Sequence, residues 1–107
     1  MVAPIPKGLL IHEITYEDFK SGRHGDEYLE PQEVKYVRLD AKTKRIKTAD
    51  GQDIISQTTL FWDAVNSDYC RFHKNGRVTF NGTQMHVKEV GLFHDESKLH
   101  HLEVSLE

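Results

Sequence analysis

The chain has 107 residues, of which 37% are hydrophobic and 29% charged, so it predicts one domain with a thin core and much polar surface. Its formal net charge of −3 does not favour nucleic-acid binding by the whole surface, but it leaves room for a local basic patch. Cys70 is the one cysteine, which excludes an intramolecular disulfide and favours a reducing compartment. No apolar run approaches the ~20 residues that a membrane span needs, and the proline-rich start is unlike a signal peptide.

The N-terminal third predicts an arm, a strand and a loop. Residues 1–8 hold two of the three prolines and predict an extended arm rather than a helix. Residues 9–19 are rich in Ile, Leu, Thr and Tyr, which favours a first strand. Residues 21–31 carry two glycines and a proline, which is typical of a loop or the tip of a flexible hairpin.

The middle of the chain predicts two strands joined by a long polar connection. Residues 32–40 form a second strand whose apolar side chains change from one face to the other, a pattern that often marks a β-bulge. Residues 41–53 are mostly polar and turn at Asp50-Gly51, which indicates a long exposed hairpin or an ordered loop. Residues 54–65 are the strongest β-branched and aromatic segment and predict a strand of about ten residues.

The last third, residues 77–106, predicts an antiparallel meander. Asn81-Gly82 separates two apolar runs, and Asn-Gly is the pair that most readily forms a type I′ hairpin turn. The polar segment 94–98 separates the second run from a third, residues 99–106, in which apolar and polar residues alternate as in a half-buried strand. Such a meander cannot bury its apolar face alone, so the preceding strands must cover it.

The patterns of the whole chain agree on one fold class. No segment shows a sustained 3.6-residue apolar period, no repeat of 20 to 50 residues appears, and strands recur about every ten residues. The sequence therefore predicts a single all-β domain over residues 1–107, with residues 1–8 as its arm. We expect a small β-barrel or a two-sheet sandwich, with a C-terminal antiparallel meander and one long exposed loop or hairpin.

Histidines and the cysteine supply groups for a metal or catalytic site, but not the required spacing. Seven histidines are present without the pairing of a zinc site, and adjacent His100 and His101 should point to opposite faces of a strand. Cys70 should face away from His73, whereas a nucleophilic cysteine needs an imidazole beside it. Neither a phosphate-binding glycine loop nor a nucleophile elbow occurs. We expect no enzyme, no metal and no cofactor.

A basic run in the predicted hairpin is the most suggestive motif. Its four cations, which lie within six residues, are Lys42, Lys44, Arg45 and Lys47. They could contact phosphates, or they could be solvated side chains that keep an exposed strand edge from pairing with other chains. In a ring of subunits the first interpretation gains weight, because each charge repeats around the axis and the fields add. Interleaved aromatic residues are missing from this run, which disfavours single-strand binding.

Aromatic residues are spread along the chain, and most of them are expected in the core. Consecutive Phe61 and Trp62 must face opposite sides of their strand, so at most one of them fills a one-sided core. The other is expected on a second core face or in a subunit contact.

Three short stretches carry a resemblance to a known family. They are the opening MVAPIPK with LIH at residues 10–12, TLFWDAVNS at 59–67, and the closing hairpin with LHHLEV at 99–104. Together they resemble the minor capsid proteins encoded beside head–tail connector genes in phages and prophages of Gram-positive bacteria. The chain is also similar to the head-closure proteins of tailed bacteriophages.

This resemblance implies a structural protein of the virion. It implies a β-barrel that assembles as a ring below the portal, helps to close the DNA channel and joins the tail. The implied partners are further copies of the chain, the portal or adaptor, the tail-completion proteins and packaged double-stranded DNA, with no membrane. The implied location is the head–tail connector of the virion, after synthesis in the cytoplasm of the bacterial host.

The resemblance also implies roles for particular residues. The connection 41–53 best fits the loop that head-closure proteins can point into the channel, so its four cations are expected to face DNA. Ile5, Trp62 and His100 are the candidate subunit contacts. Two alternatives from other classes are a stand-alone OB-like or SH3-like module that binds nucleic acid or peptide as a monomer, and a small metal-dependent enzyme.

Overall fold

The protein is an all-β domain, as the sequence predicts. The computed structural model describes residues 3–22, 25–49, 51–96 and 98–107, with the backbone alone for 43–48 and 52–56. In chain order its elements are a 3-10 helix, Lys7–Leu9, and the strands β1 His12–Glu17, β2 Phe19–Gly22, β3 Gly25–Tyr28, β4 Gln32–Thr48, β5 Gly51–Asp63, β6 Arg77–Phe80, β7 Thr83–Asp95 and β8 Lys98–Leu106. The 3-10 helix ends the arm and delays the first strand, which begins three residues later than the composition of 9–19 predicts.

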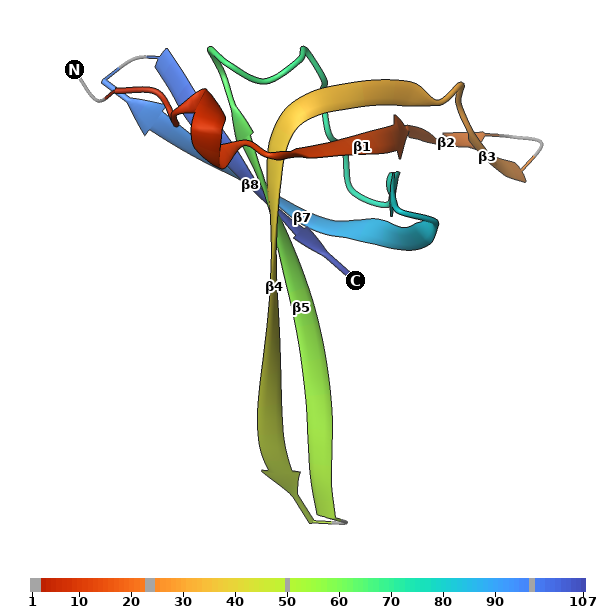
Figure 1. Cartoon of the computed structure of the whole chain (residues 1–107). Coiled ribbons are helices and arrows are strands. Elements are labelled where there is room, and N and C mark those ends of the chain that lie inside the picture. Colours follow the sequence, from red (N-terminus) through yellow and green to blue (C-terminus); the bar gives the residue numbers. More distant parts are fainter. Residues whose placement is uncertain (1–2, 23–24, 50, 97) are drawn as a thin grey trace.

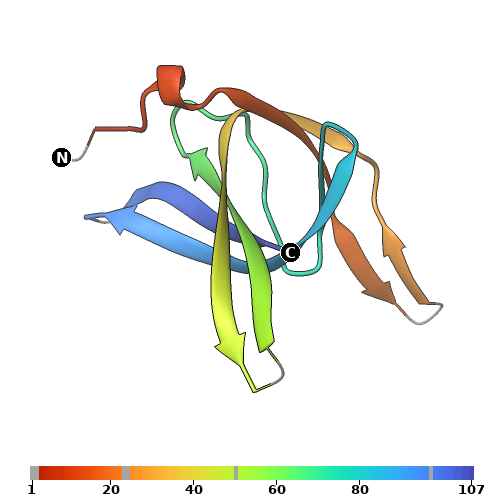
Figure 2. The same ribbon diagram turned by 60° about the horizontal axis from the view of Figure 1, so that its bottom comes forward.

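Six strands close into a barrel in the order β1-β4-β5-β8-β7-β6, and every neighbouring pair is antiparallel. Strands β2 and β3 form a separate two-stranded sheet that projects from the barrel (Figures 1 and 2). Of the two expected architectures, the structure is therefore the barrel. The predicted C-terminal meander is confirmed as strands β6, β7 and β8.

The barrel is filled by one apolar core to which all six strands contribute. Its fully buried side chains alternate with more exposed ones along β8, where Leu102, Val104 and Leu106 point inward, as the period of two predicts. Residues 64–76, which contain no strand, cover one end of the barrel and add Cys70 and Phe72 to the core. This single core therefore joins all six strands of the barrel.

A β-bulge at Tyr36 bends β4 around the barrel. His12 of β1 pairs with Val37, but Glu13 pairs with Lys35, so Tyr36 is the extra residue of the longer strand. Its φ of +60° lies in the left-handed region, which a bulged residue can require. The bulge lets Val34 and Val37 both point into the core, three residues apart, and confirms the predicted change of face.

One predicted turn and one predicted hairpin are confirmed by the backbone, whereas Asp50 of the predicted Asp50-Gly51 turn lies outside the described residues. Asn81 and Gly82 both have positive φ values, +49° and +81°, as a type I′ turn requires, and they join β6 to β7. The connection 41–53 is a hairpin, because β4 and β5 pair continuously from Val37↔Trp62 to Thr48↔Gly51.

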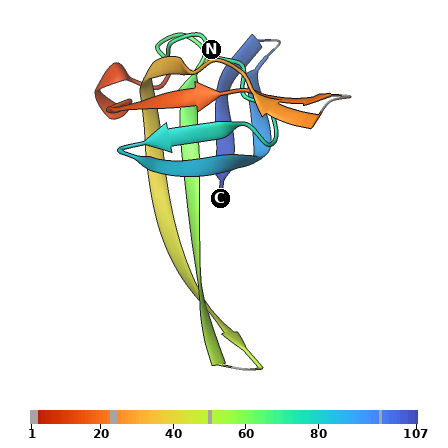
Figure 3. The same cartoon turned by 90° about the vertical axis from the view of Figure 1, so that its right-hand side faces the viewer.

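This β4–β5 hairpin extends well beyond the barrel (Figures 1 and 3). Strand β1 pairs with β4 only as far as Val37, and β8 pairs with β5 only as far as Thr58. Beyond those points the two long strands pair only with each other. The long exposed hairpin expected from the polar sequence is thus confirmed.

The barrel closes along a short seam between β1 and β6. The seam has three residue pairs, Thr15↔Thr79, Tyr16↔Val78 and Glu17↔Arg77. Arg77 donates from Nε and Nη2 to the two carboxylate oxygens of Glu17, at 2.9 and 2.8 Å. Its guanidinium also lies 4.2 Å from the ring centroid of Tyr28, so the same side chain joins the seam to β3.

We predict that the Glu17–Arg77 pair makes the seam acid-sensitive. The hydrogen bonds from Arg77 hold the pKa of Glu17 below its usual value of 4.5. A lowered pKa in the folded state contributes stability above the unfolded pKa, and this stability is lost as the pH falls through the folded value. The free energy of unfolding, measured in urea, should therefore be larger for the wild type than for Glu17→Gln at pH 7. The difference between the two proteins should shrink below about pH 4.5.

The matched control is Glu30→Gln, which removes a carboxylate from an exposed position in the connection between β3 and β4. A difference between wild type and Glu17→Gln that stays constant from pH 7 to pH 3 would contradict the role of this ion pair.

Candidate functional site

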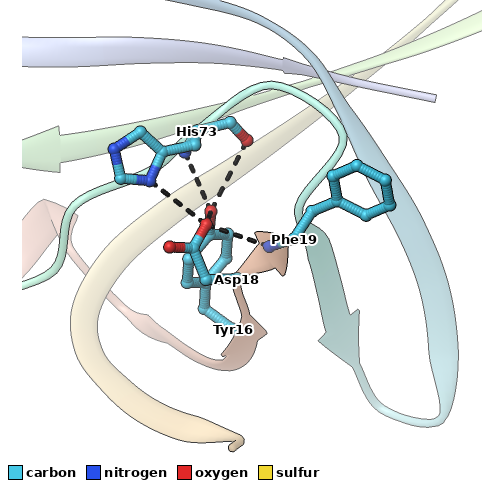
Figure 4. Close-up of polar contacts among 4 residues, drawn as sticks. All are labelled: Tyr16, Asp18, Phe19 and His73. Atoms are coloured by element: carbon cyan, nitrogen blue, oxygen red, sulfur yellow. Dashed lines mark hydrogen bonds and ion pairs between the residues drawn. The ribbon is translucent and has the colours of Figure 1, made fainter. Parts of the chain in front are cut away.

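Residues 64–76 are fastened to the barrel by the buried Tyr16. Its hydroxyl accepts a hydrogen bond from the backbone N–H of His73 at 2.8 Å and donates to Oδ1 of Asp18 at 2.9 Å (Figure 4). The same carboxylate oxygen accepts from the backbone N–H of Phe19 and lies 3.1 Å from Nδ1 of His73. Burial, reinforced by Asp18, raises the pKa of Tyr16, so the hydroxyl keeps the proton that it donates.

The same surroundings make Cys70 a poor nucleophile. Burial of the thiol, with the charge of Asp18 as a second cause, raises the pKa of Cys70 to about 12. A nucleophilic cysteine needs the opposite shift and an imidazole within reach. The imidazole of His73 instead lies against Asp18 (Figure 4). Cys70 is thus a small apolar core residue that remains protonated at neutral pH.

The N-terminal arm is held by the turn that follows β5. Asp63 is fully buried, and its Oδ1 accepts the backbone N–H of Ile5 at 2.9 Å. Its Oδ2 accepts the N–H groups of Val65 and Asn66, which shapes the turn, at 2.9 and 2.8 Å. Asn66 then donates from Nδ2 to the carbonyl of Ile5 at 2.7 Å, so both backbone groups of that residue are bound. We call this contact the arm clasp.

His100 adds a second contact to the arm. Its Nε2 lies 2.7 Å from the carbonyl oxygen of Ala3, so this nitrogen donates. Its Nδ1 lies 2.8 Å from Nδ1 of His101, whose Nε2 is 3.0 Å from the carboxylate of Glu103. Glu103, His101 and His100 therefore form a series of polar contacts along β8 that ends at the arm.

The expectation that His100 and His101 point to opposite faces is wrong. In the β7–β8 register His101 pairs with Phe93, but the next pair along is Leu99 with His94. His100 is therefore left without a partner in the register, as in a bulge, and a bulge breaks the alternation of side chains. The simple period of two does not apply at this position.

The structure brings two of the three predicted subunit-contact residues together. Ile5 and His100 both take part in holding the arm, through the arm clasp and the Ala3 contact. Trp62 instead points into the core, where it is 7% exposed and donates from Nε1 to the carbonyl of Asp68. Phe61, its neighbour, is the more exposed of the two. Contacts of these residues with a second subunit remain predictions.

The four predicted DNA-facing cations, Lys42, Lys44, Arg45 and Lys47, lie on the part of β4 that has left the barrel. Lys42 is exposed, and the side chains of the other three fall outside the described residues. Among the described residues, no group of three His, Cys, Asp or Glu side chains is placed to hold a metal ion.

A groove runs beside residues 69–74, and sequence patterns gave no indication of it. It has a volume of about 870 Å³ and lies between this loop and strands β7 and β8. Its apolar wall includes Trp62, Tyr69, Phe72, Val90, Leu92 and Leu102, and its polar rim is made by Arg71, His73, Lys74, Lys88 and Glu89. The loop that forms one wall follows no periodic pattern, so only the tertiary structure reveals the groove. We call it the β7–β8 groove.

Comparison with known proteins identifies the family. A family model described as minor capsid protein matches residues 6–106, which is nearly the whole chain. The chain belongs to this minor capsid protein family. The match confirms the resemblance drawn from the sequence and gives this minor capsid protein a structural role in the virion. No curated protein and no solved structure matches the chain.

Two further observations bear on the expectations from the sequence. The family is a structural one, which agrees with a Cys70 thiol that is held protonated. Within the part of the minor capsid protein that the structure describes, no helix is long and apolar enough to cross a membrane.

We predict that Gly76→Ala destabilises this minor capsid protein. A Cβ atom at this position would lie 2.6 Å from Cε1 of Tyr16 and would also collide with its hydroxyl. Because Tyr16 is buried and hydrogen-bonded on both sides, it cannot move aside without breaking its contacts with His73 and Asp18. The loss in the free energy of unfolding should be about 1–3 kcal/mol, measured by urea denaturation.

Gly8→Ala is the matched control, because a Cβ there meets nothing within 4 Å. Equal losses in the two variants would show that the close approach of Tyr16 is not what requires a glycine at position 76.

We predict that Asp63→Asn both destabilises the barrel and frees the arm. The amide offers one accepting oxygen in place of two and turns an N–H₂ group toward backbone donors. The free energy of unfolding should fall by about 1–3 kcal/mol. Limited proteolysis should cut within residues 1–8 faster than in the wild type. Asp26→Asn, at an exposed position, is the control, and an arm that resists cleavage equally in Asp63→Asn would contradict the arm clasp.

Proposed function

We propose that this minor capsid protein is a head-completion component that forms a ring below the portal, helps to close the DNA channel and joins the tail. Its partners are then further copies of itself, the portal or adaptor, the tail-completion proteins and packaged double-stranded DNA. Its place is the head–tail connector, after synthesis in the host cytoplasm. The observation that carries the proposal is the β4–β5 hairpin, which leaves a closed barrel and bears a cluster of cations.

The hairpin suits a part that must reach across a channel from a fixed platform. On β5, residues 51–57 lie beyond the last pair with β8, and at about 3.4 Å per residue they span about 24 Å. At its root the hairpin continues directly into two barrel strands, β4 and β5, whose inward side chains are in the core. The barrel therefore fixes the direction of the hairpin, while the described strand residues beyond Thr58 and Val37 pair only with each other.

The charge of the hairpin supports contact with a polyanion. Residues 41–57 hold four cations and two acidic residues, whereas the whole chain has a net charge of −3. The positive charges of this segment therefore lie on the β4–β5 hairpin, which extends well beyond the barrel (Figure 1). In a ring these charges repeat around the axis, and neutralised phosphates would release counterions, so retention of DNA should depend on salt.

We predict that replacing all four cations of the hairpin, Lys42, Lys44, Arg45 and Lys47, by Ser leaves assembly intact but weakens DNA retention. The substitutions lie outside the barrel, so co-sedimentation with portal-bearing heads should be unchanged. The fraction of heads that keep their DNA should fall, and fall further as salt rises, because phosphate contacts are lost. The measurement is nuclease-protected DNA in purified particles.

The control variant carries Lys20→Ser, Lys35→Ser and Lys98→Ser, which remove exposed cations away from the long hairpin. Equal DNA retention in all three proteins would remove the channel role. A wild-type chain that ignores heads but binds an oligonucleotide as a monomer, with a steep salt dependence, would overturn the head-completion proposal in favour of a nucleic-acid-binding module.

A further inference from the structure

His100 and His101 connect the N-terminal arm to a carboxylate through three contacts, each of which needs one hydrogen. Nε2 of His100 lies 2.7 Å from the carbonyl oxygen of Ala3, which only accepts. Nδ1 of His100 lies 2.8 Å from Nδ1 of His101, so one of these two nitrogens must donate to the other. Nε2 of His101 lies 3.0 Å from a carboxylate oxygen of Glu103, which accepts when it is ionised. Together the contacts require three hydrogens.

This number of hydrogens fixes the charge of the histidine pair. A neutral imidazole carries one ring N–H, so two neutral histidines supply two of the three hydrogens. The third arrives as an added proton, which makes one ring an imidazolium whose charge is balanced by Glu103. Either ring can be the imidazolium, because the shared hydrogen lies between the two Nδ1 atoms. The contacts therefore belong to a pair that holds one proton beyond the neutral state.

A change of charge in either direction breaks one of these contacts. If the added proton is lost while the outer contacts with Ala3 and Glu103 are kept, the two Nδ1 lone pairs face each other. If a second proton is gained, both Nδ1 atoms carry a hydrogen at a separation of 2.8 Å, in two positive rings whose centroids are 5.0 Å apart. In both cases the rings repel, and the ring that holds Ala3 is turned away from its partner.

The surroundings leave this pair as the titrating group closest to the start of the arm. Residues 3–6 carry no titratable side chain. The carboxylate of Asp63, which pairs with His101 in the register, accepts the backbone N–H groups of the arm clasp. Phe93 stacks on the ring of His101, with centroids 4.8 Å apart, and adds no charge. The other charged or titratable groups on the flanking strands are Glu103 on β8, and His94, Asp95 and Lys98 toward the β7–β8 turn.

Water can exchange protons with the pair. The side chains of His101 and Glu103 are 20% and 35% exposed, and His100 is half-buried. Imidazole is the side chain whose unperturbed charge changes between about pH 5 and 8. Because hydrogen bonds that involve an ionised group are about twice as strong as neutral ones, the charge of the pair should decide how firmly the arm is held.

We propose that His100 and His101 share one added proton and form a pH-dependent latch for the N-terminal arm. Figure 1 shows the arm beside the ends of β7 and β8, where the pair lies. The latch holds Ala3, and the arm clasp holds Ile5 two residues later. Opening of the latch on either side of an intermediate pH therefore frees the start of the arm. This inference goes beyond the proposed function, because it needs neither a ring nor DNA.

The first test counts the hydrogens on the pair by NMR of the imidazole nitrogens between about pH 4.5 and 9. At the pH where Ala3 is held most firmly, both Nε2 atoms should carry a hydrogen. The two Nδ1 atoms should share one, with a scalar coupling between them across the hydrogen bond. The protons should leave in two steps that belong to the pair. Two neutral rings, or two imidazolium rings, at that pH would overturn the latch.

The second test follows the arm in the same samples. The NMR chemical shift of the Ala3 carbonyl carbon reports the bound fraction, because a hydrogen bond to the oxygen changes it. The ratio of bound to free arm should be largest at intermediate pH and fall at least about fivefold on each side, as a charge-assisted hydrogen bond is lost. A ratio that stays constant over the whole range would contradict the proposal.

Two variants separate titration from hydrogen bonding. In His100→Gln the amide donates to Ala3 without gaining or losing a proton, so the ratio should vary less than about twofold with pH. His101→Phe removes the partner of Nδ1, and His100 then holds Ala3 through Nε2 in its neutral and charged forms alike, which should also flatten the profile. The matched control is His86→Gln, at an exposed position on β7 outside the pair, which should keep the wild-type profile.

The outcomes distinguish the latch from the buried carboxylate of the arm clasp. A loss on the acid side that is as large in His100→Gln as in the wild type would show that Asp63 releases the arm, and it would overturn the latch. The same conclusion follows if His86→Gln flattens the profile as strongly as the two variants of the pair. Circular dichroism and urea unfolding verify that each variant is folded before its arm is measured.

Discussion

Closure of the barrel along β1 and β6 is the constraint on which the other features depend. The seam has only three residue pairs, and its last pair is the ion pair between Glu17 and Arg77. Arg77 also holds Tyr28 at the base of the β2–β3 hairpin. Asp18 follows Glu17, and its Oδ1 contacts both the hydroxyl of Tyr16 and Nδ1 of His73, which belongs to residues 64–76. An open seam would therefore release the β2–β3 hairpin and the loop wall of the β7–β8 groove together with the core.

Local patterns were sufficient to predict most of the fold. The φ values of Asn81 and Gly82, the inward alternation of β8 and the long β4–β5 hairpin all follow from residues that are neighbours in sequence. Even the bulge at Tyr36 was indicated by the sequence, since the apolar residues around it change from one face of the strand to the other. These features need only the chirality of the backbone and the burial of apolar side chains.

The contacts that sequence patterns missed join distant segments. Asp63 binds Ile5 across 58 positions, and Tyr16 binds His73 across 57, so neither contact has a local signature. The segment that includes Asp63 did carry part of the family resemblance, and the structure shows that its carboxylate shapes a turn and holds the arm. The alternation rule failed at His100 because a register shift in β7–β8 is a tertiary property.

The β4–β5 hairpin is attached to the barrel only at its root, and this separates its length from the rest of the fold. Past Thr58 neither strand contacts another strand in the register. Adding two residues to each strand would extend the hairpin by about 7 Å. Because side chains alternate with a period of two, the same faces of both strands would stay inward at the root. The reach of the hairpin can therefore change with the length of one exposed segment, without any adjustment of the core, the seam or residues 64–76.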